Sequence, residues 1–355
     1  MKFLHIILSA AILCCATAVF AQMPANYYNA TRDLCGEELR QALHSIISGH
    51  TEFEYGQLWG KFYQTDVDAS NHIIDIYTDT CNFYAGNDQC GNYSKECDCY
   101  NREHTVPQSW FGDSTPMRTD LFHVYPTDGW ANNKRGNLPL ATVSNPTYTS
   151  SNGSKVGQST YPGYSGQAFE PADEYKGDLA RTYFYMSVRY MNRNLGQTSE
   201  SMFSGSQLKP WALQMLIQWH YADPVSQKEI DRNNAIYTIQ RNRNPFIDCP
   251  YFVDAIWHDH CDFENCLSPD AGTNIAQTAP KLSAYPNPSA DLVNISCEKP
   301  MTSLSMFNIL GEKTFCSETG ANFATINLEP YESGIYFVKA TFDDGSSATT
   351  KIIKY

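Results

Sequence analysis

The densest cluster of chemically unusual residues is Cys99-Tyr100-Asn101-Arg102-Glu103-His104-Thr105-Val106-Pro107-Gln108-Ser109-Trp110-Phe111-Gly112. If this stretch is a strand, Glu103 and His104 point to opposite faces, so one can face a metal ion and the other a substrate. A carboxylate suits a hard cation such as Mg²⁺ or Ca²⁺, and a histidine can take a proton from water. An isolated Glu-His pair is also common on protein surfaces, so this pair alone does not decide the function.

Other unusual segments follow in a fixed order. They are Asp120-Leu121-Phe122-His123-Val124-Tyr125-Pro126, Asn132-Asn133-Lys134-Arg135-Gly136-Asn137, Lys176-Gly177-Asp178-Leu179-Ala180-Arg181-Thr182-Tyr183-Phe184-Tyr185-Met186, Asp231-Arg232-Asn233-Asn234, and Gln240-Arg241-Asn242-Arg243-Asn244-Pro245-Phe246-Ile247-Asp248. Taken singly, Asn132 and Asn133 could form a plain turn. Together with residues 99–112, these blocks make most of residues 25–265 resemble the bacterial endonuclease I family.

The resemblance implies an α+β fold whose active site is a ββα-metal unit, also called a His-Me finger. It implies that His104 is the general base and that Glu103 and Asn132 are ligands of Mg²⁺, with Ca²⁺ or Mn²⁺ as alternatives. Carboxylate and amide oxygens are suited to such hard cations. An arginine usually assists in the family, and the candidates are Arg118 and Arg135. Cleavage in the family leaves a 5′-phosphate.

The chain departs from the family at Phe122. Many relatives have His-His or His-Asn after Asp-Leu, whereas this chain has Phe122 in the first of these positions and only His123 remains. Arg241 and Arg243 are candidates for nucleic-acid contact, with salt bridges as the alternative role. For Arg181, a salt bridge is the favoured interpretation. Arginines that contact only the phosphate backbone would give little sequence preference.

The formal net charge of −13 opposes this interpretation. Proteins that hold nucleic acid electrostatically tend to be basic, and the chain contains no run of Lys and Arg. A nuclease of this composition therefore needs a locally positive groove and a bound cation. With 42% hydrophobic and 18% charged residues, the chain is typical of a globular protein.

Four regions are predicted along the chain. Residues 1–21 have a positive start, an apolar run and a small residue, Ala21, at their end, which is typical of a cleaved signal peptide and less so of a membrane anchor. Residues 22–267 form the endonuclease I domain, and the small, polar residues 268–282 form a linker. Residues 283–355 form a small all-β sandwich. We expect no stable membrane insertion.

The 12 cysteines fall into even sets once Cys14 and Cys15 of the signal segment are left out. Even sets are expected if disulfides form within separate domains in an oxidising compartment. The alternative is a metal site at residues 97–99 or at Cys261 and Cys266, although neither has the spacing of a structural zinc site. The members are Cys35, Cys81, Cys90, Cys97, Cys99, Cys249, Cys261 and Cys266, followed by Cys297 and Cys316.

Hydrophobic periodicity predicts three helices in the larger domain: residues 178–191 with Asp178 as cap, residues 211–219, and a helix from Pro224 to about Gln240. Apolar and polar residues alternate weakly over residues 71–77, which predicts a strand there. Near the end of the chain, short β runs at 292–297, 304–309, 323–328, 335–342 and 349–355 predict the sandwich.

The C-terminal region resembles a type IX secretion sorting domain through Tyr285-Pro286-Asn287-Pro288, Ile309-Leu310-Gly311 and Gly334-Ile335-Tyr336-Phe337-Val338. This resemblance implies export by the type IX machinery, followed by release or attachment at the cell surface. The alternative is a β-sandwich that binds a carbohydrate or a protein.

The combined hypothesis is a secreted, metal-dependent endonuclease that acts on DNA and also on RNA. Two alternatives remain: a catalytically silent surface binding protein on the same scaffold, and a phosphodiesterase that acts on a non-polymer substrate.

Overall fold

The computed structural model describes residues 23–257, 282–297, 299–309, 311–343 and 346–355. They form two hydrophobic clusters, one between Tyr28 and Ile256 and one between Leu282 and Ile352. The predicted signal peptide 1–21 lies outside the described residues, as does the predicted linker 268–282 apart from Leu282. None of the helices in the described part combines the length and hydropathy needed to span a bilayer.

Residues 23–257 mix helices with short strands, as the α+β prediction required. The α-helices are α1 (Gly36–Ile47), α2 (Leu58–Thr65), α3 (Gly129–Arg135), α4 (Lys176–Arg189), α5 (Pro210–Ala222), α6 (Gln227–Gln240), α7 (Pro245–Asp248) and α8 (Phe252–Trp257). The strands are β1 (Tyr100–His104), β2 (Val124–Asp128), β3 (Val143–Thr149), β4 (Lys155–Ser159), β5 (Gln167–Glu170), β6 (Phe203–Ser204) and β7 (Gln207–Leu208). Short 3₁₀ turns are η1 (Asn29–Thr31), η2 (Tyr55–Gln57), η3 (Gln108–Phe111), η4 (Met117–Thr119) and η5 (Asp173–Tyr175).

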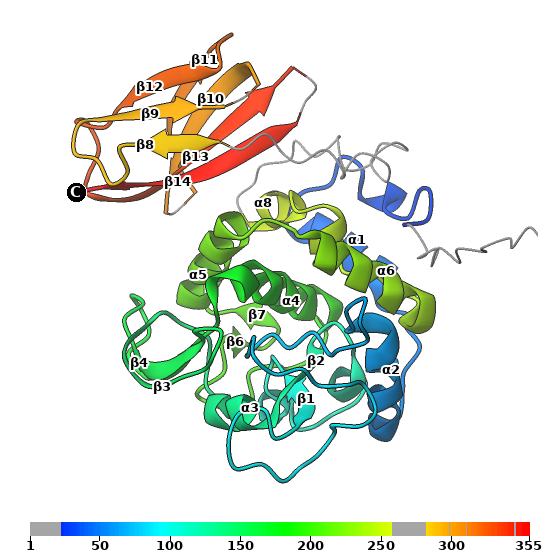
Figure 1. Ribbon diagram of the computed structural model, residues 1–355. Coiled ribbons are helices and arrows are strands. Elements are labelled where there is room, and N and C mark those ends of the chain that lie inside the picture. The colour runs from blue at the N-terminus through cyan, green and yellow to red at the C-terminus, as the bar shows by residue number, and fades with distance from the viewer. Residues whose placement is uncertain (1–22, 258–281, 298, 310, 344–345) are drawn as a thin grey trace, which may run out of the picture.

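Helix α4 is the centre of this part of the molecule. All its residues from Gly177 to Arg189 are buried, as expected for a helix that is covered on every side. It packs against α1, α5 and α7 (Figure 1). The hydrophobic core therefore surrounds α4, and the smaller elements are supported by it.

The unit formed by β1, β2 and α3 contains the cluster from which the sequence analysis began. β1 and β2 pair antiparallel, with Glu103 opposite Tyr125 and His104 opposite Val124. α3 starts directly after β2 because Asp128 caps it, accepting a hydrogen bond from the backbone N of Ala131 at 2.7 Å. α3 packs on both strands, so the order of this unit is β, β, α.

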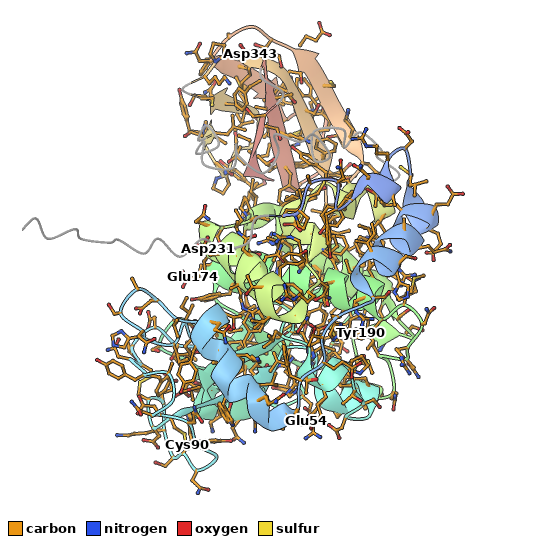
Figure 2. All side chains as sticks on the ribbon, turned by 90° about the vertical axis from the view of Figure 1, so that its right-hand side faces the viewer. Glu54, Cys90, Glu174, Tyr190, Asp231 and Asp343 are labelled. Carbon is orange, nitrogen blue, oxygen red and sulfur yellow. A yellow bond between two sulfur atoms is a disulfide. The ribbon has the colours of Figure 1, made fainter. Side chains whose placement is uncertain are left out.

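Two disulfides, Cys81–Cys97 and Cys90–Cys99, fasten the irregular segment that leads into β1. Cys35 and Cys249 are disulfide-bonded as well. The metal site considered for residues 97–99 is therefore wrong, while Cys261 and Cys266 lie outside the described residues. Cys90 lies at the end of the molecule opposite Asp343 of the C-terminal sheets (Figure 2).

The helix predictions are correct in type and wrong at some ends. α5 covers the predicted residues 211–219. α4 begins at Lys176 with Tyr175 as its cap, and Asp178 instead lies in the first turn, 2.9 Å from Lys228 Nζ. α6 begins after Ser226, which forms a capping box with Glu229, so Pro224 lies outside the helix.

Residues 71–77 are not a strand. Only single bridges connect Ile73 with Val67 and His72 with Tyr84. The weak alternation of apolar and polar residues did not produce a strand, because no strand among the described residues extends these bridges into a ladder.

The C-terminal region consists of a four-stranded sheet in the order β11-β10-β13-β14 and a three-stranded sheet in the order β12-β9-β8, sharing one core. Five predicted strands are confirmed, and β8 and β11 were missed. The bounds are β8 (Ser283–Tyr285), β9 (Leu292–Ser296), β10 (Met301–Asn308), β11 (Lys313–Glu318), β12 (Phe323–Asn327), β13 (Gly334–Phe342) and β14 (Ser347–Lys354).

The expected disulfide between Cys297 and Cys316 is wrong, because both thiols are free. Cys297 is buried after β9 in one sheet, whereas Cys316 is exposed on β11 in the other. The C-terminal sheets contact the larger part through Ser347, whose Oγ is 2.7 Å from the Tyr251 hydroxyl. This contact lies at the end of the molecule away from β1 and α3 (Figure 1).

Candidate active site

Strand β1 carries two chemically different faces. Asn101 and Glu103 share one face and Arg102 and His104 the other, because side chains alternate along a strand. The first face lies against α3: Asn132 Nδ2 donates to Asn101 Oδ1 at 2.6 Å. The predicted metal ligands Glu103 and Asn132 are therefore brought to the same side of β1.

Glu103 is only 2% exposed, and two side chains contact its carboxylate. The Tyr77 hydroxyl donates to Oε1 at 2.7 Å, and Arg135 Nε lies 3.4 Å from the same atom. Burial raises the pKa of Glu103, while the positive charge of Arg135 and the hydrogen bond from Tyr77 oppose that rise. The backbone N–H of His104 also donates to this carboxylate. Tyr77 and Arg135 contact Oε1 and not Oε2.

The residues on this face fit a hard cation. Asn132 uses its amide nitrogen toward Asn101, which leaves its oxygen Oδ1 to coordinate. Among the described residues, no group of three or more His, Cys, Asp or Glu side chains is arranged to hold a metal. A cation here would therefore use one carboxylate, amide oxygen, water and substrate, a combination that Mg²⁺ tolerates well.

His104, on the other face, has a fixed tautomer. Its Nε2 is 2.9 Å from the backbone carbonyl oxygen of Arg118, and a carbonyl can only accept, so Nε2 carries the proton. Nδ1 therefore carries the lone pair. Burial, then His123, lowers the pKa of His104 to about 3, and the charges of Arg118 and Arg102 act in the same direction. The imidazole is therefore neutral at pH 7 with its lone pair at Nδ1, and the lowered pKa makes it a weaker base than free imidazole.

His123 packs next to the His104 ring inside the core. It is fully buried, its ring centroid is 5.5 Å from that of His104, and its Nε2 is 2.5 Å from the carbonyl oxygen of Met117. It is enclosed in the core, so it is not placed to contact a substrate.

Arg135 is 1% exposed and is surrounded by protein acceptors. Its Nη2 donates to the carbonyl oxygen of Thr105 at 2.6 Å, and its Nη1 donates to those of Gly136 at 2.9 Å and His104 at 3.2 Å. It therefore fastens the end of β1 to α3. Arg118, by contrast, is half-buried, with its guanidinium carbon 4.4 Å from the ring centroid of Tyr55. The structure thus separates the two arginine candidates.

Residues 35–251 match the family model described as Endonuclease I.

The chain belongs to the endonuclease I family.

Curated relatives agree with this assignment. The chain is 36% identical over 239 residues to an extracellular ribonuclease of Bacillus amyloliquefaciens, covering 65% of this chain and 78% of the relative. It is 35% identical over 246 residues to the extracellular ribonuclease of Bacillus subtilis (strain 168), with the same coverage. It is 26% identical over 132 residues to endonuclease-1 of Buchnera aphidicola subsp. Acyrthosiphon pisum, covering 37% of this chain and 45% of the relative.

Residues 283–355 match the family model described as a secretion system C-terminal sorting domain. The endonuclease I family member is therefore an enzyme, a nuclease, and is secreted or located at the cell surface.

The arginines predicted outside the β1–α3 unit have different environments. Arg243 is 2% exposed and forms two hydrogen bonds of 2.7 Å with Asp248, which favours a structural role. Arg241 is exposed just after α6. The salt bridge predicted for Arg181 is confirmed: it contacts Glu229 at 2.6 Å and 2.8 Å and is fully buried.

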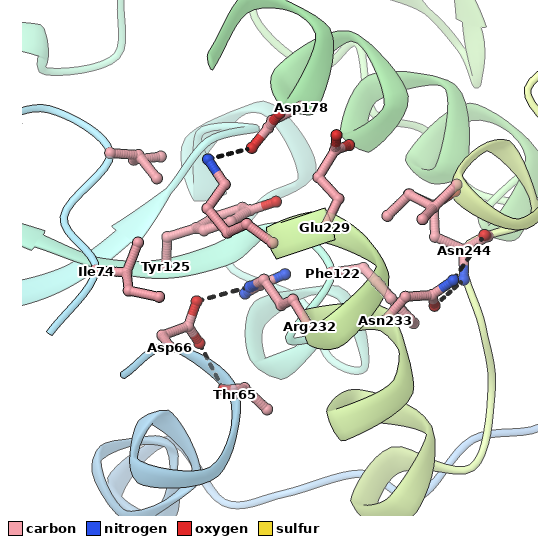
Figure 3. A pocket seen from close by; sticks show the side chains of 13 residues that line it. Thr65, Asp66, Ile74, Phe122, Tyr125, Asp178, Glu229, Arg232, Asn233 and Asn244 are labelled. Carbon is pink, nitrogen blue, oxygen red and sulfur yellow. Dashed lines mark hydrogen bonds and ion pairs between the residues drawn. The ribbon is translucent and has the colours of Figure 1, made fainter. Parts of the chain in front are cut away.

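A pocket lined in part by Tyr125 of β2 contains none of the candidate site residues (Figure 3). Its charged side chains are paired with one another: Arg232 Nε is 2.6 Å from Asp66 Oδ1, and Lys228 is bound to Asp178. These internal ion pairs join α6 to the segment after α2 and to α4, so the pocket is part of the supporting structure.

Sequence reasoning missed Tyr55 and Tyr77, which contact the candidate site residues. Tyr77 is 26 positions from Glu103, and only the folded chain brings the two together. Arg102 lies within the quoted stretch, and its alternation with His104 could have identified it.

Proposed function

We propose that this endonuclease I family member hydrolyses internal phosphodiester bonds of DNA and RNA, with little sequence preference, using one divalent cation. The observation that carries the proposal is that Glu103 and His104 lie on opposite faces of β1. Glu103 is on the same face of β1 as Asn101, which binds Asn132 of α3, while the neighbouring His104 is on the other face with its Nε2 fixed by a carbonyl oxygen. This provides both requirements of phosphodiester hydrolysis, a base for water and a place for a cation.

Glu103 Oε2 and Asn132 Oδ1 would hold the cation, Mg²⁺ in the first instance, with Ca²⁺ and Mn²⁺ as alternatives. When bound, a cation of this kind neutralises charge that develops on the phosphate and the leaving oxygen. Tyr77 and Arg135 hold the Glu103 carboxylate in place through Oε1. They are positioning residues, since neither is exposed to a substrate.

His104 removes a proton from the attacking water at Nδ1. The carbonyl of Arg118 keeps the imidazole in the required tautomer and orientation. Of the two arginine candidates, Arg118 is the one that can assist at the phosphate, because its guanidinium is not enclosed by protein acceptors. Attack in line with the 3′-oxygen leaves a 5′-phosphate on the product.

The substrate assignment rests on the relatives and on the chemistry of the site. Relatives include proteins named extracellular ribonuclease and a protein named endonuclease-1. The residues around His104 that could touch nucleic acid include Arg102 and Arg118, and contacts from these side chains to backbone phosphates would carry no sequence information. The sorting domain would deliver the enzyme through a type IX system.

The metal assignment is tested by titrating Mg²⁺ in plasmid nicking by wild type, Glu103→Gln, Asn132→Ala and the control Asn133→Ala. Asn133 is the exposed neighbour of Asn132 on α3. We expect the first two variants to need about ten-fold more Mg²⁺ or more, with Asn133→Ala unchanged, and chelator to abolish cutting. Full activity in excess chelator contradicts the proposal. No cutting by folded, oxidised wild type would favour the silent surface protein, and cutting of small phosphodiesters alone would favour the phosphodiesterase.

A further inference from the structure

Two arginines share the aromatic ring of Tyr55 next to His104. The guanidinium carbon of Arg102 is 3.6 Å from the Tyr55 ring centroid and that of Arg118 is 4.4 Å from it. The His104 ring is stacked on the same tyrosine, with the ring centroids 5.8 Å apart. Tyr55 thus contacts two positively charged side chains next to His104, the proposed general base.

Neither arginine has a counter-charge from the part of the chain that the structure describes. Within the described residues, no carboxylate lies at ion-pair distance from Arg102 or Arg118, and the Nε of each is buried without a hydrogen-bond partner. Five other arginines do have carboxylate partners: Arg40, Arg135, Arg181, Arg232 and Arg243. In a chain with a net charge of −13, two adjacent unpaired guanidinium groups are suited to bind an external anion.

Arg102 is held firmly in this position. Its Nη1 donates to the backbone carbonyl oxygen of Tyr55 at 2.7 Å, and Trp59 covers it from another side, with the ring centroid 4.4 Å from the guanidinium carbon. Tyr55 is itself fixed by the capping box between Glu54 and Gln57 at the start of η2. The remaining N–H groups of Arg102 have no acceptor among the described residues.

The spacing of the two guanidinium groups suits a nucleic-acid strand. Their distances of 3.6 Å and 4.4 Å from one ring centroid limit the separation of the two carbons to their sum, 8.0 Å. Successive phosphates of a strand in a duplex are about 3.4 Å apart along the axis. Guanidinium groups no farther apart than 8.0 Å can contact one phosphate and its neighbour on the same strand.

We infer that Arg102 binds a second backbone phosphate of the substrate, close to the phosphate that is cleaved beside His104 and Arg118. This inference rests on the proposed function and adds a subsite to it. The subsite makes a polymer a better substrate than a single phosphodiester, and it requires no base contact. Tyr55 keeps the two guanidinium groups apart and oriented.

The first test is the salt dependence of kcat/KM on a single-stranded oligonucleotide for wild type, Arg102→Gln, Arg102→Lys and the control Arg32→Gln. Arg32 is an exposed arginine before α1, so its variant removes the same charge outside the site. We expect Arg102→Gln to lower kcat/KM about ten-fold to a hundred-fold, mainly through KM, and to reduce the slope of log kcat/KM against log salt by about 0.7. Arg102→Lys should keep most of the slope, and Arg32→Gln all of it.

The second test compares two pentanucleotides: one with phosphodiesters throughout, and one whose only phosphodiester is central, with neutral methylphosphonates elsewhere. Arg102→Gln should lose activity on the first and match wild type on the second, whereas Arg118→Gln should lose on both. Equal losses on both substrates for Arg102→Gln, or an unchanged salt slope, would overturn the inference. Wild type that cuts neither substrate would instead count against the proposed function, so the two failures are distinguishable.

Discussion

Replacing Arg135 by methionine removes a buried cation and leaves its partners in place. Three backbone carbonyls lose a donor, and the Glu103 carboxylate, 2% exposed, loses the only positive charge within ion-pair distance among the described residues. Breaking one side of a buried ion pair destabilises proteins by about 3–5 kcal/mol. For a folding unit of this size, 1 kcal/mol shifts Tm by about 2–4 °C, so we expect Tm to fall by about 6–20 °C.

The matched variant is Arg118→Met. Arg118 is half-buried and forms no ion pair with the described residues, so its loss should change stability by about 0.5 kcal/mol or less while it sharply reduces cleavage. Thermal unfolding by circular dichroism and oligonucleotide cleavage on the same preparations separate the two roles. If Arg135→Met kept the wild-type Tm, or if Arg118→Met lost as much stability, the distinction between positioning and substrate contact would be refuted.

The other predictions concern single contacts. Tyr77→Phe removes the hydroxyl that donates to Glu103 and should lower the unfolding free energy by about 1.5–3 kcal/mol and weaken Mg²⁺ activation; unchanged values in urea unfolding and Mg²⁺ titration would contradict this. The His220 pKa is lowered to about 3 by burial and by Arg181, whereas the unfolded value is near 6.5, so stability should fall as pH drops from 6.5 toward 3, by at most about 1.4 kcal/mol per pH unit for this group. His220→Asn should flatten that pH dependence, and an identical slope would count against it. Replacing both Cys81 and Cys97 by serine opens a loop with a sequence separation of 16 and should lower the unfolding free energy by about 3 kcal/mol; no change in the urea midpoint would show that the bond does not restrain the unfolded chain.

Local sequence chemistry predicted the parts of the site that lie close together in the chain. Glu103 and His104 are adjacent, so alternation alone places them on opposite faces once β1 forms. Asn132 lies on a short helix directly after β2, as the family resemblance implied. These are relationships over a few residues, which backbone geometry fixes.

Contacts between distant segments could not be predicted in the same way. Tyr55 and Tyr77 look like ordinary aromatic residues, and their roles depend on the packing that brings them to β1. Arg135 looked equal to Arg118 because burial is a property of the folded chain. Cys297 and Cys316 were expected to pair from their number alone, whereas the sheets place them apart.

The central claim is that the imidazole of His104 removes a proton from the attacking water, and chemical rescue tests it most directly. His104→Gly should lower cleavage of an oligonucleotide with saturating Mg²⁺ by about 10²–10⁴-fold. Added imidazole should restore part of this activity, with a pH dependence that follows the free imidazole base. Wild-type activity in His104→Gly would contradict the account, as would a folded, Mg²⁺-binding variant whose lost activity imidazole does not restore at any pH.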